Sequence, residues 1–415
     1  MAGNMQDGIY YDRPPGNSFC LMFMKISRSA RTSDLIKELS ELWKLYDELK
    51  RGKVKDLPIQ PTHSHHGNLS VLLGYGPKIF EGVISGIKKN KPNDLIHEKG
   101  FKGPNISSGD PIAAGSSINF TKDILKNHAP EEHVIIQFIA DTEMFTNRAV
   151  VETWKHIKNR KILNISKFYM GFKRIDQRGW LGFHEGIANI NPKERLEAIA
   201  INNSVSNEDK WLINGTYMAF IRFVIDLERW EKLSLSQQEL IIGRKKITGC
   251  PIIGFDKNGV PINDPNCPVE GTAEVIDEGN EQFRQHPKFN EKSLPRYGSD
   301  KSLLISHIHR VHKPNIHPPS DYRSLRIFRQ GFEFLEPVET HPGFQVGLNF
   351  VSFQNNPQKI MKILTLQHWL GRSMNTTYSN NTKELETFTL AKTAGIFLIP
   401  PFNKDEPFPG SIMFL

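Results

Sequence analysis

The sequence predicts an α+β fold in which two related halves follow one another along the chain. Two observations identify the elements: alternating or continuous apolar runs are typical of strands, and apolar residues three and four positions apart are typical of amphipathic helices. A third observation indicates the two halves, because this succession of strands and helices starts again in the second part of the 415 residues. No stretch approaches the roughly 20 consecutive apolar residues of a membrane span, so we expect no membrane partner.

The first half reads as strand, helix, strand, strand and helix, which is the order of a ferredoxin-like unit. Residues 34–49 carry apolar side chains at spacings of three and four, as an amphipathic helix does. NLSVLLGYG (68–76) is apolar and ends in glycines, which indicates a strand that stops at a turn. The expected elements are a strand at 17–27, a helix at 34–49, strands at 68–76 and 133–141, and a helix at 146–160.

The second half repeats the pattern around an insertion. GTYMAFIRFVIDLERWEKLS (215–234) predicts a strand that leads into a helix, and 234–246 continues as helix. Residues 251–300 are rich in Gly, Pro, Asn and Asp, which predicts a long surface loop. The remaining expected elements are strands at 324–334, 346–354 and 395–401 and a helix at 356–370. We therefore predict one ferredoxin-like domain over 1–175 and a second over 176–415.

Charge, cysteines and the first residues of the chain predict its kind of partner and its location in the cell. The formal net charge is +8, but Lys and Arg are interspersed with Asp and Glu, which argues against a nucleic-acid partner. Cys20, Cys250 and Cys267 are widely spaced and predict buried or incidental thiols rather than a disulfide framework. The first residues lack the basic start and cleavage site of a signal peptide, so we expect a cytoplasmic location.

A glycine-flanked carboxylate is the first candidate for chemistry. GWLGFHEGIAN (179–189) places Glu185 between Gly182 and Gly186. Glycines allow a tight turn and a close approach of the backbone to a ligand, and a carboxylate held in such a turn can accept a proton. Taken alone, the segment fits a solvated loop acid better than a catalytic one.

A histidine cluster and two arginines supply further candidates. SHIHRVHKPN (306–315) contains His307, His309 and His312, and histidine ligates haem iron or zinc through one ring nitrogen. No further ligands with zinc-site spacing are evident. SLRIFRQGFEF (324–334) places Arg326 and Arg329 in a predicted strand. Side chains three apart on a strand face opposite sides, and an inward guanidinium needs a partner or a charged ligand. The alternative reading of each arginine is a surface residue.

Together, these segments resemble the dye-decolorising (DyP-type) haem peroxidase family from about residue 66 to the end. The glycine turn is similar to the family's GxxDG signature, the histidine segment to its S-H-I-R-R-x-x-P segment, and the arginine strand to its R-I-L-R-R-G-F-x-Y strand. Further matches in the same order are NLSVLLGYGPKIFE (68–81), the G-R-x-x-x-T-G-x-P pattern that ends the stretch 227–252, GLNFVSFQNNP (347–357) and GIFLIPP (395–401).

The resemblance implies a barrel-like pair of ferredoxin-like halves with haem b in the C-terminal half. It places His307 on the axial iron ligand, Arg329 on the distal arginine and Glu185 on the distal aspartate. The acid here is one methylene longer than the family's, so the efficiency of the first chemical step is open. Gly186 is expected beside the cofactor. Arg310 is expected to face a haem propionate, because arginine suits carboxylates, with a surface arginine as the alternative.

The activity that the resemblance implies is the reduction of hydrogen peroxide with oxidation of a bulky organic donor, such as a dye or a phenol. A catalytically weak haem-binding protein for haem handling or sensing is the alternative, and a haem-free structural module is a third reading that rests on charge alone. Self-association is also expected, because the family often shows it. The physiological reductant and the carboxylate partner of His307 are not predicted.

Overall fold

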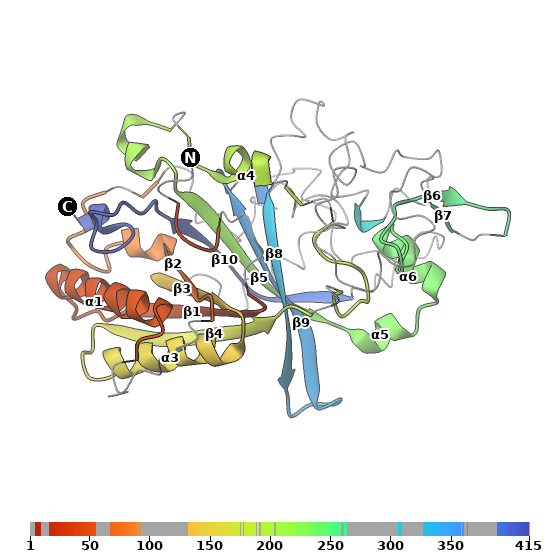
Figure 1. Cartoon of the computed structure of the whole chain (residues 1–415), viewed down its shortest axis with the longest axis horizontal. Coiled ribbons are helices and arrows are strands. Elements are labelled where there is room, and N and C mark those ends of the chain that lie inside the picture. Colours follow the sequence, from red (N-terminus) through yellow and green to blue (C-terminus); the bar gives the residue numbers. More distant parts are fainter. Residues whose placement is uncertain are drawn as a thin grey trace.

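The computed structural model of the protein describes a closed barrel with helices outside it (Figure 1). The described residues are 5–9, 16–54, 67–89, 91–92, 132–174, 176, 178–187, 189–190, 192–202, 205–258, 261–263, 306–308, 327–357, 359–360, 363 and 388–414. The predictions for Arg310, His309, His312, Cys267, Arg326 and most of the helix at 356–370 lie outside these residues.

The first half has the elements that the sequence predicts and one more strand. In chain order they are β1 (Ser18–Ile26), α1 (Thr32–Lys50), β2 (Ser70–Tyr75), β3 (Val134–Ala140), α3 (Glu143–Ile157) and β4 (Leu163–Phe172). The order is strand, helix, strand, strand, helix, strand, and β4 completes the ferredoxin-like unit.

The second half contains four long strands and several short helices. Its elements are α4 (Pro192–Ile199), β5 (Thr216–Ile225), α5 (Leu227–Glu231), α6 (Leu235–Ile242), β6 (Ile252–Phe255), β7 (Pro261–Asn263), β8 (Phe328–Pro337), β9 (Phe344–Gln354) and β10 (Thr389–Ile399). Short 3-10 helices lie in both halves: η1 (Pro77–Phe80) in the first, and η4 (Asn207–Leu212) and η11 (Ser411–Phe414) in the second.

The eight long strands close into one antiparallel barrel in the order β1-β3-β2-β10-β5-β9-β8-β4. The strands of each half are contiguous, and each half arranges its four strands in the order fourth, first, third, second. Two seams join the halves, through the pairs Leu398–Tyr75 and Phe172–Glu333. The α+β prediction of two ferredoxin-like halves is confirmed, whereas the division at residue 175 stays a prediction.

Several predicted boundaries are wrong. The helix predicted over 234–246 ends at Ile242, because Gly243 takes a left-handed conformation with φ 84°. The strand predicted at 395–401 begins earlier, at Thr389, where β10 pairs with β5. The loop predicted over 251–300 starts with a small hairpin of β6 and β7.

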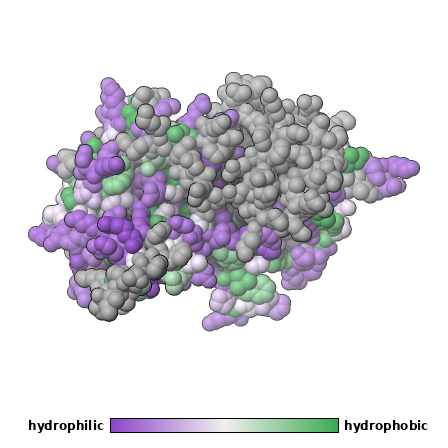
Figure 2. All heavy atoms as spheres, in the orientation of Figure 1, coloured by the Kyte–Doolittle hydropathy of each residue, from purple (hydrophilic) through white to green (hydrophobic). Residues whose placement is uncertain are grey.

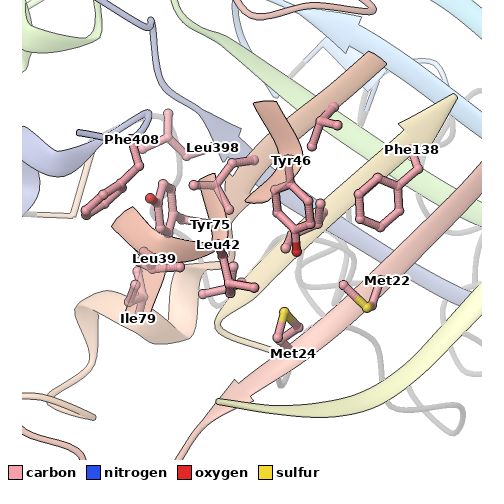
Figure 3. Close-up of a cluster of buried hydrophobic side chains, with 14 of the residues drawn as sticks. Met22, Met24, Leu39, Leu42, Tyr46, Tyr75, Ile79, Phe138, Leu398 and Phe408 are labelled. Carbon is pink, nitrogen blue, oxygen red and sulfur yellow. The ribbon is translucent and has the colours of Figure 1, made fainter. Parts of the chain in front are cut away.

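Alternate side chains on the strands fill two separate cores. Phe19, Phe220 and Phe332 belong to the barrel interior, where Phe19 and Phe332 stack with ring centroids 4.4 Å apart. Residues of the opposite strand faces pack under α1 and η11, and Figure 3 shows Phe138 of β3 beside Tyr46 of α1. On β8, the even-numbered residues Phe328 and Phe332 therefore point inward and the odd-numbered residues point outward.

The outer surfaces of the two halves differ. Helices α1 and α3 lie side by side on the first half (Figure 1), and the surface over α1 is largely hydrophilic (Figure 2). Hydrophobic residues gather near the β8–β9 hairpin (Figure 2), where Leu335 and Phe344 are exposed. Among helices in the described part of the chain, none combines the length and the apolar character needed to span a bilayer.

The cysteine prediction is partly wrong. Cys250 is buried, as one alternative of the prediction has it, but it is disulfide-bonded and therefore not a thiol. Cys20 is a free thiol in the core, and burial raises its pKa far above the usual range.

Candidate functional site

The glycine-rich segment after β4 forms a tight loop. Arg178 and His184 pair as an isolated antiparallel bridge, and the turns on either side of Glu185 pass through Gly182 and Gly186, with φ 83° and 77°. These left-handed conformations strain residues that carry a Cβ. The tight turn predicted from the glycines is therefore present.

Arg178 ties this loop to the segment after α6. Its Nη1 donates hydrogen bonds of 2.8 Å to the Gly182 carbonyl and 2.6 Å to the Lys246 carbonyl. Its Nη2 donates at 2.9 Å to the Ile247 carbonyl. The loop consequently lies on the side of the barrel where α5, α6 and the β6–β7 hairpin gather (Figure 1).

The carboxylate of Glu185 packs against the outer face of β8. A Cβ built on Gly331 would lie 3.1 Å from Glu185 Oε2, and one on Gly179 would lie 2.9 Å from Glu185 Oε1. Both distances are shorter than ordinary van der Waals contacts, so the carboxylate occupies space that these two glycines leave open.

Arg329 lies on the same outer face of β8, two residues before Gly331. The spacing puts the two positions roughly 7 Å apart along the strand. The guanidinium Nη2 of Arg329 donates at 2.9 Å to the Ile187 carbonyl, which follows Glu185 in the loop. The structure thus brings Glu185 and Arg329, more than 140 positions apart in the sequence, to one face of one strand.

Asn189 holds the loop in register with this strand. Its Oδ1 accepts the backbone N–H of Arg329 at 3.1 Å, and its Nδ2 donates to the Arg329 carbonyl at 2.7 Å. The sequence analysis did not single out Asn189, although it lies in the glycine-rich segment.

Replacing Asn189 with alanine is expected to lower the free energy of unfolding by about 1–3 kcal/mol, because the Arg329 backbone groups lose both partners. Chemical denaturation measures the change. Asn355→Ala is the matched control, since the half-buried Asn355 side chain makes a single, long hydrogen bond of 3.5 Å to the residues that the structure describes, and we expect a change within about 0.5 kcal/mol. Equal effects of the two variants would show that the two hydrogen bonds between Asn189 and the Arg329 backbone contribute nothing to stability.

A second arginine, Arg244, lies close to Arg329. Its side chain is buried at the end of α6 and donates at 2.9 Å to the Gly249 carbonyl. Burial, and then the positive charge of Arg329, lower the pKa of Arg244 to about 10. Within the residues that the structure describes, Arg244 forms no salt bridge. A buried cation in this state is stabilised by an anionic ligand.

His307 lies next to the end of α6 that carries Arg244. A Cβ built on Gly243 would lie 2.5 Å from Ser306 Oγ and 2.7 Å from Ile308 Cγ1, so the residues on both sides of His307 pack against that glycine. His307 is half-buried and in helical conformation. The histidine segment thus packs at Gly243, the neighbour of Arg244, and the positive charge of Arg329 acts on Arg244.

Glu333 is a further buried acid that the sequence analysis missed. It follows Gly331 on the outer face of β8 and is 3 % exposed. Its Oε1 accepts the backbone N–H of Trp180. Burial, and then the charge of Glu185, raise the pKa of Glu333 to about 8. Gly179 and Trp180, in the loop that carries Glu185, lie against this carboxyl group.

Comparison with known proteins identifies the family of the chain. The model of the family "Dyp-type peroxidase, C-terminal" matches residues 176–404, more than half of the chain. A deferrochelatase of Shigella flexneri is 24% identical over 353 residues, which are 81% of this chain and 67% of that protein. A dye-decolorizing peroxidase of Mycobacterium tuberculosis is 30% identical over 131 residues, 31% of this chain and 36% of that protein.

Solved structures show the same fold. The crystal structure of a DyP-type peroxidase from Streptomyces coelicolor superposes with a TM-score of 0.67 at 17% identity, covering 100% of this chain and 96% of that one. The family match over the half that carries Glu185, Arg244, His307 and Arg329 identifies the relationship. The chain belongs to the Dyp-type peroxidase family, whose members are oxidoreductases acting on peroxide.

Proposed function

We propose that the protein is a haem-b-dependent peroxidase that reduces hydrogen peroxide and oxidises bulky organic donors such as dyes or phenols. The observation that carries this proposal is the placement of Glu185 and Arg329 on one face of β8. A proton acceptor next to a fixed positive charge is what heterolysis of a peroxide bond requires.

The residues around Arg244 fit an anionic haem. Arg244 is a buried cation without a carboxylate partner in the described ranges, and the two carboxylate groups of a haem suit a guanidinium. His307 lies at the same end of α6 and would ligate the iron through one ring nitrogen. Arg310 and Gly186 remain predicted contacts of the cofactor. When bound, the iron supplies the redox chemistry.

The chain's own residues then perform the proton transfers. Glu185 takes one proton from hydrogen peroxide and returns it to the far oxygen, which leaves as water. An unperturbed glutamate has a pKa of about 4.3 and an aspartate one of about 3.9, so Glu in place of Asp still supplies a base at neutral pH. Arg329 stabilises the negative charge that develops on the leaving oxygen.

A series of substitutions at Glu185 tests the base. We expect Glu185→Gln to lower the rate of the peroxide reaction by about 100- to 10 000-fold, the usual contribution of a general base. Glu185→Asp, which keeps the carboxylate and has the family's residue, is expected to retain turnover. Stopped-flow mixing of haem-loaded protein with peroxide measures both.

Glu197→Gln is the matched control for this series, because Glu197 is an exposed acid on α4. We expect it to react like the wild type. A Glu185→Gln variant that also reacts like the wild type would remove Glu185 from the mechanism.

A haem-handling protein with weak peroxidase activity is the second candidate. Two observations favour it: the long alignments are with proteins named deferrochelatases, and Glu185 replaces the family's aspartate. Steady-state turnover with peroxide and a dye separates the candidates. Low turnover that rises in Glu185→Asp supports haem handling, whereas high turnover in the wild type supports the peroxidase.

The location of the protein in the cell and its self-association also stay predictions. The sequence analysis predicts the cytoplasm, but the disulfide at Cys250 points to an oxidising compartment, because disulfides are rare in reducing ones. Self-association is predicted from the family resemblance. Cell fractionation with sedimentation of the purified protein tests both.

A further inference from the structure

Two carboxyl groups from different elements meet beside the glycine turn. A Cβ built on Gly179 would lie 2.9 Å from Glu185 Oε1 and 3.0 Å from Glu333 Oε1. The same small space at Gly179 therefore separates the two acids. Glu333 reaches it from β8, and Glu185 reaches it from the loop that covers β8.

The two oxygens of Glu333 have different surroundings. Oε1 accepts the N–H of Trp180, whereas Oε2 is buried and forms no hydrogen bond with any residue that the structure describes. An ionised carboxylate needs partners on both oxygens when it is removed from water, but a protonated carboxyl leaves only a neutral hydroxyl there. These surroundings favour the neutral form of Glu333.

The charges that face Glu333 do not offset its burial. Glu185 and Asp176 are acidic, and Arg174 is the basic group that faces it. Arg174 is committed to Asp176, to which its Nε and Nη2 donate at 3.0 and 2.5 Å. Desolvation and repulsion by Glu185 outweigh the hydrogen bond from the Trp180 N–H and the attraction of Arg174, which is why the pKa of Glu333 rises to about 8.

We propose that Glu333 is a positioning residue for Glu185: the pair holds one proton at neutral pH, this proton resides on Glu333, and Glu185 is left to act as the base. The inference rests on the proposed function for its catalytic meaning. The proton on Glu333 does not enter the reaction, since the one taken from peroxide by Glu185 is the one returned to the leaving oxygen. Two acids whose environments separate their protonation can divide the roles of neutral partner and base.

The proposal predicts an alkaline transition in the peroxide reaction. Ionised Glu333 adds a negative charge close to where charge develops on the leaving oxygen, so the wild-type rate should fall as the pH passes about 8. Glu333→Gln has the shape of the protonated acid but cannot ionise. We expect this variant to lack the transition, and Glu339→Gln, an exposed acid in the same β8–β9 hairpin, to keep it.

A measurement on the haem-free protein tests the pair independently of turnover. Infrared difference spectra between pH 6 and pH 9 report protonated carboxyl groups, which absorb apart from carboxylates. The pKa of Glu333, about 8, lies between these two pH values. We therefore expect the wild type to lose one buried carboxylic acid signal near pH 8, and we expect Glu333→Gln to lack that loss. Because two interacting acids titrate together, the signal belongs to the pair until the variant assigns it.

Stability gives a second readout, with a definite sign. The pKa of Glu333 is higher in the folded than in the unfolded chain, so its protonation stabilises the fold at low pH and this stabilisation is lost as the pH rises from about 4.5 through about 8. The thermal midpoint of the wild type should therefore fall more steeply over this range than that of Glu333→Gln.

The outcomes are distinct. No carboxylic acid signal lost near pH 8 in the wild type, or an equal loss in Glu333→Gln, would overturn the inference, and the wild-type spectrum decides this even if the variant does not fold. If Glu333 titrates as expected but the protein does not react with peroxide, the proposed function fails, and with it the catalytic role of Glu333. The conclusion that Glu333 holds the proton would still stand.

Discussion

Arg329→Ala is expected to lower the rate of the peroxide reaction by about 100- to 1000-fold, the usual effect of removing one preorganised donor that stabilises developing charge. Haem binding should survive, because the predicted iron ligand lies on a different segment. Two structural facts support the size of the effect: Arg329 shares the outer face of β8 with the site of Glu185, and its guanidinium is fixed by the Ile187 carbonyl.

The same hydrogen bond requires a control, because loss of the side chain could also loosen the loop. Arg329→Lys keeps the positive charge but not the planar guanidinium, so it should recover part of the rate. Arg51→Ala removes an arginine exposed at the end of α1 and should change nothing. The assignment fails if Arg329→Ala, with haem bound, reacts with peroxide as fast as the wild type.

His307→Ala is expected to abolish peroxide turnover and to weaken haem binding. Loss of a group that merely orients a metal ligand typically costs about 10- to 100-fold in affinity or activity, so loss of the ligand itself should cost at least as much. Titration with haem, followed by absorption, measures the affinity and the coordination of the iron.

Added imidazole supplies the control for this variant. If the alanine leaves space next to the iron, imidazole should restore the ligand and part of the spectrum of the wild type. A His307→Ala protein with an unchanged haem spectrum would place the iron on another residue.

The sequence predicts the strands correctly where they consist of long runs of apolar residues. β1, β3 and β5 are nearly all buried, and their apolar runs identify them. β4 was missed because Asn164, Ser166 and Lys167 interrupt its apolar residues, so no apolar run stands out. The end of α6 was misplaced because apolar periodicity continues up to Gly243, where the backbone and not the pattern ends the helix.

The site follows from the sequence where residues lie in motifs. Glu185, Gly186 and Arg329 stand in short segments whose spacing resembles the family's, and the structure brings the first and last of these together. Glu333 could not be predicted in this way. From the sequence, an acid on the outer face of a strand is expected to be exposed to solvent, whereas Glu333 is buried and contacts Gly179 and Trp180 of the Glu185 loop. Arg244 does stand in a motif, the G-R-x-x-x-T-G-x-P pattern, but its nearness to Arg329 depends on how the end of α6 packs and does not follow from that pattern.

The absorption spectrum of the purified protein, loaded with haem and then mixed with one equivalent of peroxide, is the most direct test of the central claim that this chain is a haem peroxidase. We predict a Soret band on haem addition that shifts within the mixing time in the wild type and does so far more slowly in Arg329→Ala. A protein that develops no Soret band with added haem, or one whose band is unmoved by peroxide, would contradict the claim.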